Sequence, residues 1–131
     1  MQQNQFDDEK EKILSVAVNQ AAGTTLLIAA VPAVVGGPGS GLPGTPAQAI
    51  EVCGFLLTGS AASTVKFNDS TNSVDLTGPM QILAGGSLTQ SINYESLFKA
   101  APGAALSLIT TGGTITGFVN YKLSPPLPTI A

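Results

Sequence analysis

The sequence predicts an all-β fold: an antiparallel β-sandwich, jelly-roll-like, with extended N- and C-terminal arms. Eight or nine short segments rich in β-branched and aromatic residues follow one another, and turn signals separate them at close spacing. Segments this short, between glycine and proline breaks, fit strands better than helices. Their close spacing is typical of sandwiches and jelly rolls. Threonine-rich outward positions supply surface polarity without charge.

The length of 131 residues suits one domain that buries roughly two-thirds of the surface of its unfolded chain. Residues 1–12 are polar and charged and form an N-terminal arm. Residues 13–123 form the β-sandwich domain. The stretch 32–48 holds four prolines and five glycines and is a loop insertion within that domain. Residues 124–131 form a Pro-rich, polyproline-like C-terminal tail.

Strands are expected at 13–21 and 24–31, on either side of Gly23. The most apolar segment is 49–59, which carries apolar side chains on both faces and is therefore expected to be a central strand covered at least partly on both sides. Period-two alternation assigns its side chains to two groups. One group is Ile50, Val52 and Gly54, and the other is Glu51, Cys53 and Phe55.

Clean alternation in 63–69 points Val65 and Phe67 to the core and Thr64, Lys66 and Asn68 to water. A polar turn and a short strand at 73–76 follow. Further strands are expected at 87–93, 103–110 and 114–123, and the spacing of Tyr94, Leu97 and Phe98 allows one helical turn. Gly112-Gly113 predicts a hairpin between the last two strands. The predicted core comprises Val65, Phe67, Leu106, Leu108, Ile115 and Val119.

Charge is scarce and unevenly placed. Charged residues make up 10% of the chain, and residues 7–12 hold six of the thirteen charges. Nucleic-acid binding is not expected, because the chain has no cluster of cations. No run approaches the ~18 apolar residues of a membrane helix, so no membrane partner is expected. The acidic start is wrong for a signal peptide.

Catalytic residues are few, since the chain has no histidine and no arginine. Cys53 is the single cysteine and is expected to be a small buried hydrophobe. The turn around Asp69 and Asp75 is rich in oxygen and is either an ordinary turn or, less well matched, a calcium loop. The glycine pairs lack the Lys-Ser/Thr ending of a phosphate loop. No catalytic residue, metal ligand or cofactor is therefore assigned.

Several short motifs occur in a characteristic order. The strand "TVKF" is followed by "DLTGPM" (75–80), a glycine pair, "LF" (97–98), "GAALSL" (103–108) and "GGTITGFVNY" (112–121). Over about residues 23–123 the chain resembles a small β module in structural proteins of tailed bacteriophages, namely head-decoration (cement) and other minor virion proteins. The loop 32–48 and the tail depart from that pattern.

The resemblance implies a non-enzymatic virion structural protein on the capsid surface. Its role would be capsid decoration by binding between subunits of the major capsid protein, with a homotrimer as the expected state. The alternative is a tail or fibre component that binds a host-surface glycan. The arms and the loop are the expected partner-binding elements. Their candidate contact residues are Phe6, Asp7, Asp8, Leu42, Pro43, Pro125, Pro126 and Leu127.

Overall fold

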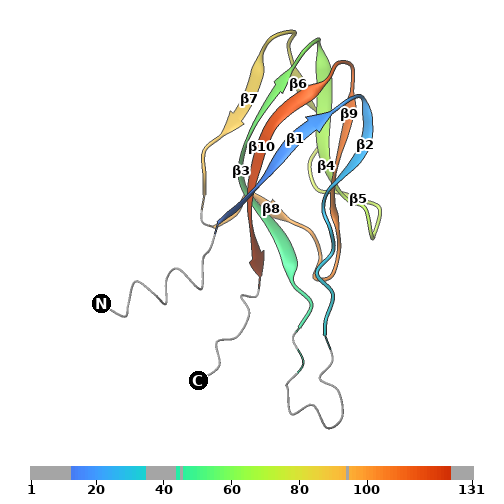
Figure 1. Ribbon diagram of the computed structural model, residues 1–131, viewed down its shortest axis with the longest axis vertical. Helices are drawn as coiled ribbons and strands as arrows, with labels where there is room; N and C mark the ends of the chain where they lie inside the picture. Colours follow the sequence, from blue (N-terminus) through green and yellow to red (C-terminus); the bar gives the residue numbers. More distant parts are fainter. Residues whose placement is uncertain (1–12, 35–43, 45, 94, 125–131) are drawn as a thin grey trace, which may run out of the picture.

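Two antiparallel sheets pack face to face in the computed structural model, which describes residues 13–34, 44, 46–93 and 95–124 (Figure 1). The first sheet contains β1 (Leu14–Gln20), β10 (Ile115–Ser124), β3 (Ala49–Gly59), β7 (Ser87–Gln90) and β8 (Phe98–Lys99). The second sheet contains β2 (Gly23–Ile28), β9 (Leu106–Thr111), β4 (Ser63–Asp69), β5 (Val74–Asp75) and β6 (Met80–Ile82). The described residues include no helix, and hence none that could cross a membrane.

The strand order identifies the topology. The first sheet runs β1-β10-β3-β7, with β8 beside β3 on the β7 side, and the second runs β2-β9-β4-β5, with β6 beside β4. If β5/β6 and β7/β8 are each counted as one interrupted strand, successive strands change sheet at every step except from β4 to β5/β6, which is the pattern of a jelly roll. The predicted fold class is confirmed for the described residues. The two arms lie outside them.

Apolar side chains from both sheets fill the space between them. All six predicted core residues are completely buried: Val65, Phe67, Leu106, Leu108, Ile115 and Val119. Phe67 lies at the centre, with its ring centroid 5.4 Å from that of Phe55 and 5.0 Å from that of Phe98. Alternation along β4, β9 and β10 points these six core residues to the space between the sheets, and their burial is a main source of stability.

β3 has the predicted central position, between β10 on one side and β7 and β8 on the other. The predicted grouping of its side chains is wrong, however. Asn120 pairs with Gly54 and Tyr121 with Val52, so Cys53 is the extra residue of a β-bulge. The bulge shifts the alternation by one position, and Val52 and Phe55 therefore both belong to the core. Cys53 itself is buried, as expected.

Two other local predictions are wrong. Gly112-Gly113 does not close a hairpin, because β9 belongs to the second sheet and β10 to the first. The pair instead carries the chain from one sheet to the other. The suggested helical turn at 94–100 is absent from its described part, residues 95–100. Phe98 and Lys99 form β8 and pair with Val52 and Glu51 of β3.

Candidate partner-binding end of the sandwich

The chain enters and leaves the sandwich at one end, which we call the arm end. The start of β1 lies there, since Leu14 pairs with Tyr121, and so does the end of β10, since Ser124 pairs with Ala49. The bridge between Val31 and Gln48 places the two sides of the long loop beside these strand ends. The described residues from which segments 1–12, 35–43 and 125–131 continue therefore all lie at the arm end.

All eight predicted contact residues fall in these three segments, outside the described residues. The three segments that carry them are far apart in sequence, but the described residues that flank them lie at the same end of the sandwich.

The opposite end, which we call the turn end, consists of short connections packed backbone against backbone. The Ser60 N–H donates to the Thr114 carbonyl at 3.0 Å, and the Thr114 N–H donates to Ser60 Oγ at 2.8 Å. Gly112 is obligatory there, because its φ is +100° and an added Cβ would lie 2.2 Å from the Ala62 carbonyl oxygen. The turn end thus has little freedom to rearrange.

Asp69 braces the arm end. Its side chain is only 2% exposed at the end of β4. One carboxylate oxygen accepts the Asn72 backbone N–H at 2.9 Å. The other accepts Asn72 Nδ2 at 2.8 Å and the Ala101 backbone N–H at 3.4 Å. One side chain therefore orders its own turn and also fixes the loop between β8 and β9.

These hydrogen bonds determine the direction in which the pKa of Asp69 is shifted. Burial acts to raise the pKa of the carboxyl, but the hydrogen bonds from the Asn72 side chain and from the backbone of Asn72, Ala101 and Thr71 outweigh it. The pKa of Asp69 is therefore lowered below its ordinary value, because each donor stabilises the ionised form. A carboxylate held in this way is charged at neutral pH and engaged as an acceptor.

The loop between β8 and β9 makes further hydrogen bonds with the polar turn. The Ser70 N–H donates to the Ala105 carbonyl at 3.2 Å, and the Ala105 N–H donates to Thr71 Oγ1 at 3.0 Å. Further along the arm end, the Gly103 N–H donates to the Gln48 carbonyl at 3.0 Å. The polar turn, this loop and the base of the long loop consequently form one hydrogen-bonded network.

Asp75 also has protein partners. Asn68 Nδ2 donates to it at 2.9 Å and Lys66 Nζ lies 3.1 Å away, and these two contacts lower the pKa of Asp75. The predicted exposure of Asn68 is wrong: it points outward but is only 9% exposed. Both aspartates thus accept hydrogen bonds from protein donors, as in a structural turn. No three His, Cys, Asp or Glu side chains in the described ranges gather as metal ligands.

An open depression of about 230 Å³ lies at the turn end. Uncharged residues line it: Ala62, Ser63, Thr64, Gln81, Ile82, Leu83 and Thr111. Leu83 on its rim is 76% exposed. No side chain that lines it acts as an acid or base near neutral pH.

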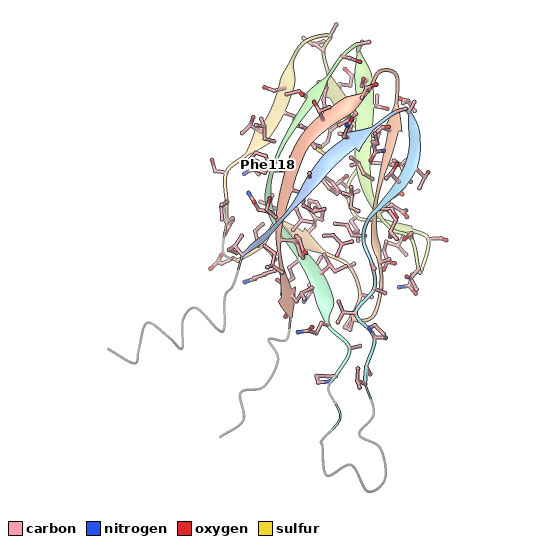
Figure 2. All side chains as sticks on the ribbon, viewed as in Figure 1. Phe118 is labelled. Atoms are coloured by element: carbon pink, nitrogen blue, oxygen red, sulfur yellow. The ribbon has the colours of Figure 1, made fainter. Side chains whose placement is uncertain are left out.

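Sequence reasoning did not single out Phe118, which is labelled in Figure 2. It lies on β10 between Ala17 of β1 and Leu56 of β3, and it is 39% exposed. Its exposure could have been predicted from the alternation along β10. Because Ile115 and Val119 are buried, position 118 lies on the opposite face. An exposed aromatic ring on the outer face of the first sheet is a second candidate contact point.

Searches against protein-family models, curated proteins and solved structures find no match to this chain.

Proposed function

We propose that this chain is a non-enzymatic virion structural protein, a capsid decoration protein that binds between subunits of the major capsid protein at the capsid surface. The observation that carries the proposal is the shared exit of segments 1–12, 35–43 and 125–131 at the braced arm end. A rigid body with three segments at one end is suited to grip several neighbouring surfaces at once.

Three further points support the proposal. The ordered motifs between residues 23 and 123 resemble those of phage decoration proteins. Jelly rolls occur in viral capsid and lectin domains, although fold alone is a weak guide to function. The aspartates of the polar turn are engaged in hydrogen bonds that hold the scaffold together, which fits a structural role.

The segments offer two modes of attachment. Residues 1–12 contain no proline and have a backbone N–H at every peptide, so they can add a strand to the sheet edge of a capsid subunit. The tail contains Pro125, Pro126 and Pro128 and is suited to lie along a groove as a polyproline helix. Both modes place the arm end toward the shell.

The test is deletion of residues 2–12, with binding measured on particles that lack the protein. We expect weaker attachment with an almost unchanged melting temperature of the free protein, because β1 begins only at Leu14. Leu83→Ser at the turn end is the matched control and should bind as the wild type does. Unchanged binding of the deletion variant would refute the attachment role, and a large fall in melting temperature would assign the arm to the fold.

Phe118 favours one alternative, a tail or fibre component that binds a host-surface glycan. An exposed aromatic ring can stack on the apolar face of a sugar, and Phe118 is 39% exposed on the outer face of the first sheet. Binding of the wild type and of Phe118→Ala to an array of host glycans separates the two functions. A glycan signal lost in the variant would favour the alternative, and no signal in either would favour decoration.

A further inference from the structure

The outer edges of the two sheets differ in how well they are protected against pairing with another chain. One edge consists of β7, of four residues, and β8, of two, which includes Lys99. Another consists of β5, of two residues with Asp75, and β6, of three, which follows Pro79. Short, interrupted strands with charge or proline nearby are the usual protection of an edge.

The edge formed by β1 has no such protection. Its seven residues pair with β10 in unbroken register from Leu14 to Gln20, and none is charged, proline or glycine. β10 is the only strand that pairs with β1 in the described part of the chain. The neighbouring edge strand β2 is shorter, and its register shifts between Leu26 and Ile28. A long, regular, uncharged edge is a template for another strand.

We propose that β1 pairs antiparallel with β1 of a second copy of this chain, about a two-fold axis at Ala17. In this register Ala17 stands opposite Ala17 of the second copy, and Val16 opposite Val18. Ser15 then faces Asn19, and Leu14 faces Gln20. The first sheets of the two copies join into one continuous sheet across the axis.

The side chains of β1 fit this pairing. Leu14, Val16, Val18 and Gln20 alternate toward the core, whereas the three residues between them are exposed. A two-fold axis at Ala17 keeps core-facing residues opposite core-facing residues, so no apolar side chain is moved into water. Val16 is only partly buried in the single chain, and Val18 of the second copy would cover it. Only neutral residues meet, so no like charges oppose one another.

The charges of the N-terminal segment fall outside the paired residues in the sequence. Residues 7–12 carry six charges and precede β1, which begins at Leu14. In the antiparallel pair, Leu14 faces Gln20 of the other copy at the end of the paired region. None of the seven residues that pair therefore carries a charge.

The proposal does not depend on the proposed function, and it differs from the three-fold state that the phage resemblance implies. Two-fold pairing makes an isologous contact and gives an even number of copies, whereas a trimer needs a heterologous contact. The mass of the purified protein in solution and the residues at the contact between two copies can therefore be measured without any viral particle.

The test uses single cysteine substitutions in the full chain under mild oxidation. Residues directly opposite across an antiparallel pair have Cα atoms about 4.5–5.5 Å apart, within disulfide range. Ala17→Cys should therefore give a covalent dimer on a non-reducing gel. Asn19→Cys should not, because its opposite residue is Ser15, and neither should Thr89→Cys on the far edge of the same sheet. Cys53 is buried and stays out of the reaction.

Charge variants give an independent measurement by light scattering. Ala17→Lys places two lysines opposite each other and should weaken self-association by about tenfold or more. An equal mixture of Ala17→Lys and Ala17→Glu should restore association, whereas Thr89→Lys should behave as the wild type. A monomeric wild type, a trimer insensitive to Ala17→Lys, or cross-linking of Asn19→Cys in place of Ala17→Cys would each overturn the proposal. Thermal melting confirms that each variant is folded.

Discussion

Asp69 accepts a hydrogen bond from the backbone N–H of Ala101 at 3.4 Å, although 32 positions separate the two residues. The same carboxylate accepts two hydrogen bonds from Asn72. A single side chain thus links the turn after β4 to the loop before β9. Both of these connections belong to the arm end.

Asp69→Ala should destabilise the fold by about 1–3 kcal/mol, because it removes a nearly buried carboxylate that accepts three hydrogen bonds, from the backbone and side chain of Asn72 and from the backbone of Ala101. Chemical denaturation of the purified protein measures this cost. The matched control is Asp75→Ala, which removes an exposed carboxylate that contacts the side chains of Lys66 and Asn68 and should change stability less. Equal effects of the two substitutions would show that Asp69 does not brace the arm end.

The lowered pKa of Asp69 predicts a dependence of stability on pH. The folded state holds the ionised form more strongly than the unfolded state, where the pKa of an aspartate is about 3.9. The stabilising contribution is therefore complete above that pKa and is lost as pH falls through the lower, folded pKa. Neutral pH lies well within the stable range.

Urea midpoints between about pH 7 and pH 2 test this dependence. Asp75 also has a lowered pKa, so the comparison is made in an Asp75→Asn background. There, the parent should lose stability on acidification more steeply than the chain that also carries Asp69→Asn. Parallel curves for the two chains would contradict the prediction.

Phe67→Ala should cost about 3–5 kcal/mol, because Phe67 is completely buried and packs against Phe55 and Phe98. Phe118→Ala deletes the same atoms from an exposed position and should cost at most about 1 kcal/mol. Equilibrium denaturation gives both values. A surface-like effect at Phe67 would mean that β4 has the wrong face toward the core.

Gly112→Ala should destabilise the turn end by about 1–3 kcal/mol or more, because it combines a positive φ with a clash against the Ala62 carbonyl. Gly78→Ala is the control, since an added Cβ there meets no atom within 4 Å. The control should be near neutral or slightly stabilising. Thermal melting compares the two, and a tolerated Gly112→Ala would refute the close packing between the sheets.

Local patterns were enough to predict the longer strands and six core residues, but not the short strands β6 and β8. Alternation around Phe67 and Leu108 identified the buried faces, since one face of each strand is apolar. The same rule failed at Cys53, because a bulge depends on the partner strand and breaks the period without any local signal. Gly112-Gly113 was misjudged for a similar reason: a turn signal does not tell whether the flanking strands share a sheet.

The candidate site was harder to predict. Sequence reasoning named the arms and the loop as partner-binding elements, but their common exit depends on pairings between distant residues, such as Ser124 with Ala49. The contact between Asp69 and Ala101 is equally long-range. The exposed position of Phe118 could have been derived, because it follows from the alternation of Ile115 and Val119.

The central proposal is that the arm end attaches this protein to the shell of a phage head, and its most direct test is the location of the protein in a purified particle. A cryo-electron microscopy reconstruction should show the jelly roll at junctions between major capsid subunits. The β1 start and the β10 end should face the shell, and the turn end around Gly112 should face solvent. Density at the tail tip or a fibre, or a particle without this chain, would contradict the proposal.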